Sequence, residues 1–339
     1  MNRERLQDIT SRYAALRIAV VGDFCLDRYL EIDPARAETS IETGLPVYNV
    51  VNVRSQPGGA GTILNNLVAL GVGELRPVGF CGEDGEGYEL QRALRQMPGV
   101  RMEYFLQTAE RRTFTYCKPL VIHPTRPHEE LSRLDSKNSS PTPTVVQEQL
   151  IASLREIAAT VDAIILLDQV DVRETGVVTN RLLDAAGEIA SSRPKLLILG
   201  DSRRGLCGWP AVSLKMNRAE LTAMTGSRES SSLSEVKQAA AELARKTSRP
   251  VFVTLSEEGI IGANAAGAVE HVASLPVRGE IDIVGAGDAV TANLTCAFAA
   301  GAALGEALEI AMVASSVVIH QLGTTGTASV AQLRERLVT

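Results

Sequence analysis

Residues 282–288 read Asp-Ile-Val-Gly-Ala-Gly-Asp, and an apolar run from Ala289 to Ala300 follows them directly. Glycines just before a helix let several backbone N–H groups converge on one point, and the helix dipole adds positive potential there. A carboxylate at the mouth of such an anion site would repel the anion. Asp288 makes chemical sense there if it removes a proton from a hydroxyl that attacks a phosphorus atom held by these amides. The plain alternative is a strand-to-helix turn in which Asp288 caps the first turn, because short glycine motifs are common.

Composition limits the classes of protein that fit the chain. Of the 339 residues, 45% are hydrophobic and only 4% aromatic, which suits helices packed on a parallel sheet. The net charge of −6 gives no support for binding nucleic acid or an anionic membrane. No apolar run reaches the roughly 20 residues of a membrane span, and the charged N-terminus lacks the apolar core of a signal peptide. The five cysteines form no CxxC pair and the four histidines lack ligand spacing, so we expect reduced thiols, no zinc and a cytoplasmic protein.

Strand patterns alternate with glycine turns and helical patterns along most of the chain. This rhythm predicts a mostly parallel sheet with helices on both of its faces. Asp23, Asp168, Asp201 and Ser256 each follow a strand pattern, so we expect them along the one edge of the sheet where ligands bind. The expected strands are 17–22, 76–80, 163–167, 195–199 and 250–255, and the expected helices are 1–16, 60–70, 86–96, 144–160, 174–191, 218–225 and 233–246.

Two extended segments, about 27–54 and 107–122, interrupt the rhythm. Within them, residues 46–53 and 112–118 are rich in Thr, Val and Tyr, and we expect these to form a small antiparallel sheet outside the main one. The expected loops, which are polar or rich in Pro and Ser, are 124–143 and 226–234.

A second glycine-rich turn enters a helix at residues 57–62, Pro-Gly-Gly-Ala-Gly-Thr. Its backbone can come close to a ligand, and Asn66 lies one turn further along. The alternative is a plain turn followed by a helix that a Gly71 C-cap closes. Asp27 lies a few residues past the first strand, where its carboxylate can accept hydrogen bonds from two sugar hydroxyls or can be a solvated loop acid.

Two further segments have the chemistry to serve a nucleotide. Asn217 and Glu220 fit the N-cap and N3 positions of a helix, which together make a capping box. The same groups can organise a Mg²⁺-bound phosphate through water, and the two interpretations are compatible. Thr254, Ser256 and Gly259 lie where a strand pattern ends in a turn whose hydroxyls and amides can hold phosphates, although Thr254 can equally be a strand residue without a ligand.

In this order and over this length, the motifs resemble those of the PfkB or ribokinase-like carbohydrate kinases. The resemblance covers residues from about 17 to 330. Within the family the chain is similar to the branch of ADP-heptose synthesis, which phosphorylates heptose 7-phosphate at its anomeric hydroxyl. The local matches to that branch are residues 20–29, 132–135 and 317–324.

The resemblance implies a three-layer α/β/α sandwich with a mostly parallel central sheet and a small β-sheet lid, in one domain over residues 1–339. The lid would be made by segments 27–54 and 107–122. Asp288 would be the general base, and the amides of Gly285, Ala286, Gly287 and Asp288 would form the anion hole. The sugar would contact Asp27, Gly58, Gly59, Thr62 and Asn66. ATP would contact Asn217, Glu220, Thr254, Ser256, Gly259, Met312 and Ser316, with Glu220 bound to Mg²⁺ through water. A potassium ion would take the Asp282 carboxylate and the Val284 carbonyl as ligands.

Several positions depart from the family pattern. Ile283 replaces a threonine before the glycines, and Thr62 stands where the heptose branch has an asparagine. Met312 replaces an asparagine expected near the adenine, and Gln321 replaces a lysine. Residues 168–172 lack the lysine and glycines of the corresponding turn in the heptose branch. No HxGH motif occurs, so we expect the second, nucleotidyl-transferring domain of some heptose enzymes to be absent.

These observations favour an ATP- and Mg²⁺-dependent kinase that acts on a hydroxyl of a sugar or sugar phosphate. A lid would exclude water, and its exposed strand edges favour a homodimer formed through the lid. One alternative is a kinase of the same family for a keto-deoxy sugar acid or a nucleoside. Another is a non-catalytic ligand sensor with the same fold, although a sensor has no need of a base. A dinucleotide oxidoreductase is disfavoured, because residues 22–25 do not form a GxGxxG turn.

Overall fold

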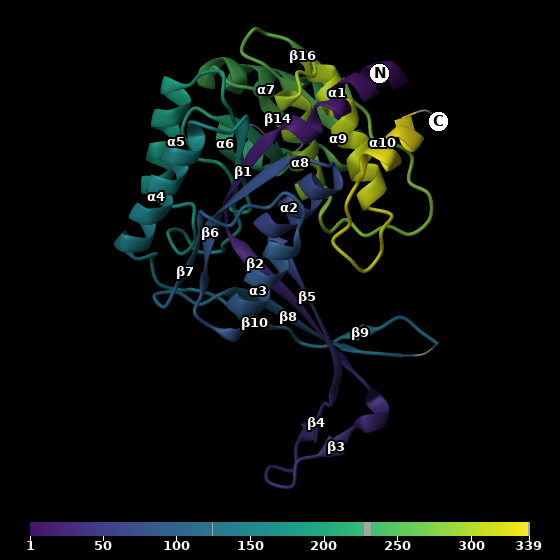
Figure 1. Ribbon diagram of the computed structural model, residues 1–339. Coiled ribbons are helices and arrows are strands. Elements are labelled where there is room, and N and C mark those ends of the chain that lie inside the picture. The colour runs from purple at the N-terminus through teal and green to yellow at the C-terminus, as the bar shows by residue number, and fades with distance from the viewer. Residues whose placement is uncertain (124, 227–231, 338–339) are drawn as a thin grey trace.

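The computed structural model describes residues 1–123, 125–226 and 232–337, and its main body is built around one large twisted sheet (Figure 1). The sheet has nine strands in the order β16-β15-β14-β13-β12-β11-β1-β6-β7. The pairings are parallel from β7 through β14, whereas β15 and β16 are antiparallel to their neighbours. The strand bounds are β1 (Arg17–Gly22), β6 (Glu74–Gly82), β7 (Phe105–Thr108), β11 (Ala163–Asp168), β12 (Leu197–Ser202), β13 (Ser213–Asn217), β14 (Val251–Thr254), β15 (Ile260–Ala263) and β16 (Val269–Val272).

Helices cover both faces of this sheet, because its strands are apolar on both sides. In β1, Ile18 and Val20 belong to one core cluster, and Ala19 and Val21 belong to the other. This alternation follows from the two-residue period of a strand. The expected mostly parallel, three-layer arrangement is therefore confirmed. The first core is covered by α1 (Arg3–Ser11), α2 (Ala60–Ala69), α3 (Gly85–Gln96), α8 (Ala286–Ala299), α9 (Leu304–Val318) and α10 (Val330–Leu337), and the second by α4 (Thr144–Ala158), α5 (Asn180–Ser192), α6 (Arg218–Thr225) and α7 (Leu233–Thr247).

A second, smaller sheet projects from the body in Figure 1, and we call it the lid sheet. Its order is β10-β8-β2-β5, and β9 pairs with β8. Only Asp23 separates β1 from β2, so the chain passes directly from the main sheet into the lid sheet. The bounds are β2 (Phe24–Ile32), β5 (Val50–Gly59), β8 (Phe114–Val121), β9 (Glu129–Glu130) and β10 (Leu134–Ser136), and a hairpin of β3 (Glu38–Thr39) and β4 (Pro46–Val47) extends beyond them.

The lid sheet differs from the sequence expectation in its pairing. The two segments predicted to pair with each other instead lie on either side of β2, antiparallel for β5 and parallel for β8. The second lid segment was expected from residue 107, but residues 105–108 form β7 of the main sheet. The expected loop 124–143 contains β9 and β10, and residue 124 lies outside the described residues. Of the expected loop 226–234, residues 227–231 also lie outside them.

Two predicted helices begin or end elsewhere. The helix expected at 174–191 begins only at Asn180, because the Thr179 side chain caps it and accepts the N–H of Leu182. Glu174 has a φ of 66° in the loop before it. The N-terminal helix ends at Ser11 and is followed by a short 3₁₀ helix, Tyr13–Ala15. The other predicted helices agree with α2, α3, α4, α6 and α7 to within two residues at each end.

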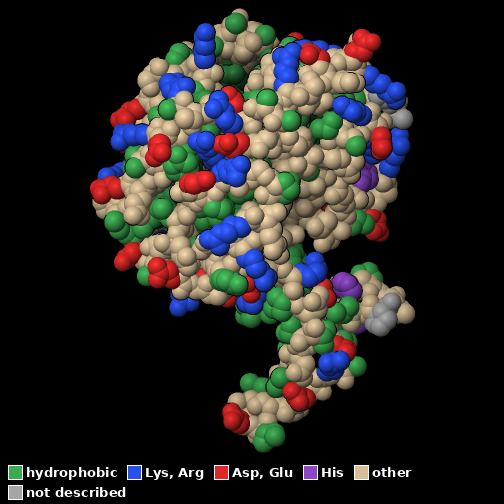
Figure 2. Space-filling model, in the orientation of Figure 1, with side chains coloured by type: hydrophobic (Ala, Val, Ile, Leu, Met, Phe, Trp, Pro, Cys, Tyr) green, Lys and Arg blue, Asp and Glu red, His purple; other side chains and the backbone are tan. Residues whose placement is uncertain are grey.

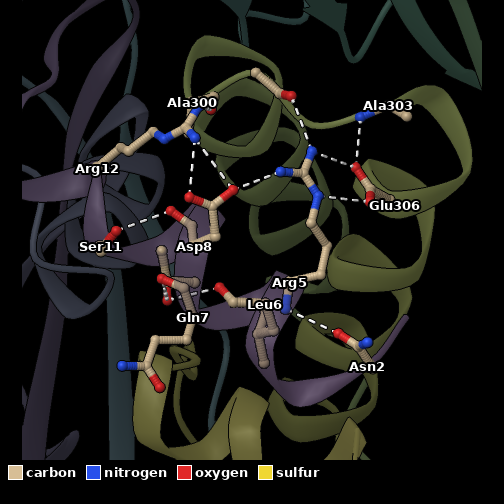
Figure 3. Close-up of polar contacts among 12 residues, drawn as sticks. Asn2, Arg5, Leu6, Gln7, Asp8, Ser11, Arg12, Ala300, Ala303 and Glu306 are labelled. Carbon is tan, nitrogen blue, oxygen red and sulfur yellow. Dashed lines mark hydrogen bonds and ion pairs between the residues drawn. The ribbon is translucent and has the colours of Figure 1, made fainter.

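Helix α1 fixes the turn that joins α8 to α9 (Figure 3). The Arg5 guanidinium donates from Nε to Glu306 Oε1 at 2.8 Å and from Nη2 to Oε2 at 2.9 Å. Arg12 Nη1 donates to the carbonyl oxygen of Ala300, the C-cap of α8, at 3.0 Å. Asp8 accepts from both arginines, so a network of charged groups holds the C-terminal end of α8. None of the helices in the described part of the chain has the length and apolar character needed to cross a membrane.

Candidate active site

The site is built around the start of helix α8. Gly285 is its N-cap and has a φ of 82°, in the left-handed region that favours glycine. The Ala286 N–H donates to Ile283 O at 3.2 Å, so that amide is already used within the turn. Gly287 and Asp288 lie in the first turn, where N–H groups have no acceptor inside the helix. Of the amides predicted for the anion hole, that of Ala286 is thus used within the turn, whereas those of Gly287 and Asp288 have no acceptor inside the helix.

The carboxylate of Asp288 is available for chemistry. In the described part of the chain it has no hydrogen-bond donor and no ion-pair partner, and its side chain is partly exposed. Burial by the surrounding protein raises the pKa of Asp288 to about 7, and the charges of Asp201 and Asp27 act in the same direction. Lys215 opposes them. A carboxylate with this pKa can accept a proton near neutral pH, as a general base must.

Behind the first turn of α8 lies a buried ion pair that sequence reasoning did not identify. Lys215 Nζ donates to Asp201 Oδ2 at 2.9 Å, and Thr291 Oγ1 donates to the same oxygen at 2.9 Å. Asp201 was expected at this edge of the sheet, but Lys215 was not singled out. Its signal was a lysine inside an otherwise apolar strand pattern, two residues before Asn217.

The predicted sugar ligands Asp27, Gly58 and Gly59 lie on β2 and at the end of β5. Asp27 is 9% exposed and pairs across the lid sheet with Gln56. Its side chain lies next to Gly58. A Cβ atom at Gly58 would lie 2.4 Å from Asp27 Oδ2, so any side chain at this position would have to displace that carboxylate. Burial raises the pKa of Asp27, and Lys118, with Nζ 3.8 Å from Oδ1, lowers it.

Gly59, Thr62 and Asn66 support the site from behind. Gly59 has a φ of 57°, and a Cβ there would lie 2.5 Å from Asp23 O. Thr62 is 2% exposed, and Asn66 is fully buried with its Nδ2 donating to Thr62 O. Whether these two residues contact the sugar stays a prediction, although neither side chain is exposed to solvent. Helix α2 packs against α8, and both side chains are buried within the protein.

On the nucleotide side, Asn217 and Glu220 form the predicted capping box. Asn217 Oδ1 accepts the N–H of Glu220 at 2.9 Å, and Glu220 Oε2 accepts the N–H of Asn217 at 2.7 Å. Burial raises the pKa of Glu220. Because a carboxylate has further lone pairs and Glu220 is partly exposed, it can still bind a hydrated Mg²⁺.

The remaining nucleotide candidates differ in exposure. Ser256 is exposed, and Thr254 is partly exposed with Oγ1 donating to Met216 O at 3.3 Å. A Cβ at Gly259 would lie only 2.0 Å from a backbone oxygen, so this glycine is needed for the turn itself. Met312 and Ser316 are 7% and 4% exposed, so these two residues of α9 are buried.

The predicted potassium ligands lie in the turn before α8. Asp282 Oδ1 accepts the N–H of Val284 at 3.0 Å, and Oδ2 accepts the N–H of Gly323 at 3.3 Å. The carboxylate thus joins the turn to the segment after α9 and keeps lone pairs for a cation. No group of three or more His, Cys, Asp or Glu side chains among the described residues could hold a metal ion.

The other two aspartates at this edge hold a loop. Asp23 Oδ1 accepts the N–H of Val177 at 2.7 Å, and Oδ2 accepts the N–H of Gln169 at 2.8 Å. Burial and the nearby Asp168 raise the pKa of Asp23 to about 7. Asp168 pairs with Arg204 at 2.6 Å. These aspartates therefore fix the loop after β11 and do not reach α8 as Asp201 does.

A cavity of about 200 Å³ lies between this loop and the lid sheet. Cys25 and Tyr116, which line it, are next to Asp27, because Tyr116 pairs with Asp27 across the strands and Cys25 lies two residues before it. The cavity therefore adjoins the predicted sugar ligand Asp27. Its apolar walls are made by Cys25, Phe114, Tyr116, Val170 and Val172.

Known proteins resemble the chain over almost its whole length. Proteins named "Bifunctional protein HldE" from Hyphomonas neptunium and Bradyrhizobium sp. are 32% and 29% identical to it, over 94% and 98% of this chain but only 63% and 65% of theirs. The chain thus spans less than two thirds of the length of these relatives. Phosphofructokinase-2 from Escherichia coli, solved with potassium, aligns with a TM-score of 0.68 at 18% identity over 95% of this chain and 98% of that one.

Ribokinase from Arabidopsis thaliana, solved with ribose and ATP, aligns with a TM-score of 0.62 at 17% identity over 95% of this chain and 97% of that one. At this identity the two solved structures show the fold alone, and they confirm the expected ribokinase-like architecture. The family model for pfkB family carbohydrate kinases matches residues 16–331. The chain therefore belongs to the PfkB family of carbohydrate kinases.

Proposed function

We propose that this protein transfers the γ-phosphoryl group of ATP to a hydroxyl of a sugar or sugar phosphate. The observation that carries the proposal is the Asp288 carboxylate, which lies in the first turn of α8 without a partner among the described residues. Its pKa of about 7 suits a group that must take up a proton near neutral pH.

In the proposed step, the acceptor hydroxyl gives its proton to Asp288 while its oxygen attacks the γ-phosphorus. The new O–P bond forms as the bond from phosphorus to the bridging oxygen of ATP breaks, and ADP leaves with that electron pair. The amides of Gly287 and Asp288 and the dipole of α8 stabilise the charge on the transferred group.

Mg²⁺, when bound, neutralises the charge of the nucleotide phosphates. Glu220 would hold its hydration shell, and Asn217 would orient the first turn of α6 beside it. Ser256 and Thr254 would border the nucleotide on the β14 side, with Met312 and Ser316 below it. Potassium beside the turn, held by Asp282 and the Val284 carbonyl, is part of the same proposal.

Cations on the cleft face of the lid sheet support an acceptor that carries a phosphate. Lys118 Nζ lies 3.8 Å from Asp27 Oδ1 and 4.9 Å from the centre of the Tyr29 ring. Arg133 and Lys137 lie over the Tyr116 ring, at 4.9 Å and 5.5 Å from its centre. Lys118 and Arg133 are the cations whose charges act on Asp27, and such a pair can hold the distal phosphate of a sugar phosphate, as the heptose 7-phosphate resemblance implies.

The 200 Å³ cavity favours a second class of acceptor. A cavity of about 150 Å³ with apolar walls is large enough to hold a six-membered ring. An acceptor with an apolar or planar group away from the attacked hydroxyl, such as a nucleoside, would gain from burial against Phe114 and Val170. A keto-deoxy sugar acid would instead place its carboxylate near Lys118.

An acceptor screen tests these proposals. ADP release would be measured with Mg²⁺-ATP and a panel of sugars, sugar phosphates, keto-deoxy sugar acids and nucleosides, for wild type and Asp288→Asn. We expect at least one acceptor to stimulate ADP release, and the variant to lose about 10²-fold or more in turnover while it still binds nucleotide. Acceptors and ATP that bind without any ADP release would instead identify a non-catalytic sensor.

We also propose a homodimer formed through the lid. Figure 2 shows the lid projecting from the body, with hydrophobic side chains at several places along it. Large exposed apolar side chains on an open sheet are a liability unless another chain covers them. The exposed residues are Ile41, Leu45, Tyr48, Val50, Val51 and Val53.

A further inference from the structure

The buried lysine in β13, Lys215, has no role in the phosphoryl transfer proposed above. Lys215 is 8% exposed and lies in a strand in which Ser213, Leu214 and Met216 are also buried. Lysine is rarely buried unless an acidic group pairs with it, and Asp201 does so here at 2.9 Å. Because buried ion pairs cost desolvation, a pair of this kind is weak evidence for a purely stabilising role.

The ammonium group of Lys215 lies against the anion hole. A Cβ atom built on Gly287 would be only 3.1 Å from Lys215 Nζ, so the lysine fills the space beside that residue. Thr291, one turn further along α8, donates to Asp201 Oδ2 at 2.9 Å and lies 3.1 Å from Gly287 O. Strand β12, strand β13 and helix α8 together fix the position of the cation.

We propose that Lys215 binds the transferring phosphoryl group and that Asp201 is a positioning residue that holds the lysine in place. This inference rests on the proposed kinase function. An ammonium group has three N–H donors, and Asp201 uses one of them, so two remain for phosphate oxygens beside Gly287. A cation fixed at that point neutralises charge as it develops in the transition state.

The charges around the lysine fit this role. Asp201, Asp288 and Glu220 all raise the pKa of Lys215 against the lowering effect of burial, so the lysine keeps its charge. Lys215 in turn lowers the pKa of Asp288. Without Lys215, the acidic groups that face the first turn of α8 would repel a nucleotide triphosphate more strongly than its diphosphate.

Nucleotide discrimination tests the proposal without any knowledge of the acceptor. The dissociation constants of ADP and of a non-hydrolysable ATP analogue with an imido bridge between the β- and γ-phosphates would be measured by calorimetry with Mg²⁺. Wild type, Lys215→Met and Asp201→Asn would be compared. We expect Lys215→Met to lose about 10- to 100-fold of the preference for the γ-phosphate, the range for a hydrogen bond to a charged group. Asp201→Asn keeps the cation and an oxygen that can accept from it, so this variant should lose less of the preference than Lys215→Met does.

The outcomes separate this inference from the kinase proposal. If wild type binds neither nucleotide, the kinase proposal itself fails. If wild type binds both nucleotides and Lys215→Met keeps the preference for the γ-phosphate, Lys215 has only a structural role and the inference is refuted. The same conclusion follows if Lys215→Met and Asp201→Asn lose that preference equally. If Lys215→Met does not fold, the double variant Lys215→Met with Asp201→Asn removes both charges and is interpreted in the same way.

Discussion

The pH dependence of activity is the most direct test of Asp288 as the base. Its pKa of about 7, raised from 3.8, belongs to the free enzyme and should appear in kcat/KM. The active form is the carboxylate, so activity should be present above pH 7 and should be lost as the pH falls through 7. At pH 6 about one tenth of the molecules carry the ionised group, and at pH 8 about nine tenths do. We therefore expect kcat/KM to rise about tenfold between pH 6 and pH 8.

The assay is ADP release with Mg²⁺-ATP and an acceptor from the screen, from pH 5.5 to 9, with unfolding followed at each pH. Nucleotide phosphates also titrate near pH 6, so matched variants are needed to assign the acid limb. Asp201 raises the pKa of Asp288 and Lys215 lowers it. The limb should therefore move to lower pH in Asp201→Asn and to higher pH in Lys215→Met, although the nucleotide is the same. A profile that is flat down to pH 5.5 in wild type, or a limb that neither variant moves, would refute the assignment of the base.

Three further changes test the acceptor side and the lid. Gly58→Ala places a Cβ 2.4 Å from Asp27 Oδ2. We expect the acceptor KM to rise about tenfold or more while the affinity for ADP is unchanged. An unchanged acceptor KM would argue against Asp27 as a sugar ligand. Gly59→Ala puts a side chain at a φ of 57°, 2.5 Å from a backbone oxygen, and should lower the free energy of unfolding in urea by about 2 kcal/mol or more. Val51→Asp should convert a dimer into a monomer by light scattering, whereas Val145→Asp, at an exposed valine of α4 outside the lid, should not; a monomeric wild type would exclude the lid dimer.

The sequence predicted the parts of the site whose groups are close together in the chain. Asn217 and Glu220 are three residues apart, and their capping box depends only on the local geometry of α6. Gly285 and Asp288 could likewise be placed at a helix entry, because glycine and a following apolar run are local signals. The pattern also predicted the layers of the fold, since buried strands and amphipathic helices have different periods.

The parts it missed depend on contacts between distant segments. Lys215 meets Gly287 only because β13 and α8 pack at a particular register, which strand patterns do not specify. The burial of Thr62 and Asn66 on α2 likewise depends on tertiary packing, in which α2 lies against α8. In the lid sheet, β2 separates the two segments that were expected to pair.

The placement of Lys215 resolves a conflict in this site between a strong base and a bound anion. Burial makes Asp288 basic enough to accept a proton near pH 7, but burial and the neighbouring acids also leave a smaller share of it ionised. A cation that fully neutralised these acids would lower the pKa of Asp288 toward its usual value and weaken the base. Lys215 is held by Asp201, whose negative charge offsets part of the effect of the ammonium group on Asp288. The anion hole therefore gains a cation while Asp288 keeps a pKa near neutrality. The same pair of residues would therefore set both the affinity for the γ-phosphate and the pH at which the base is active.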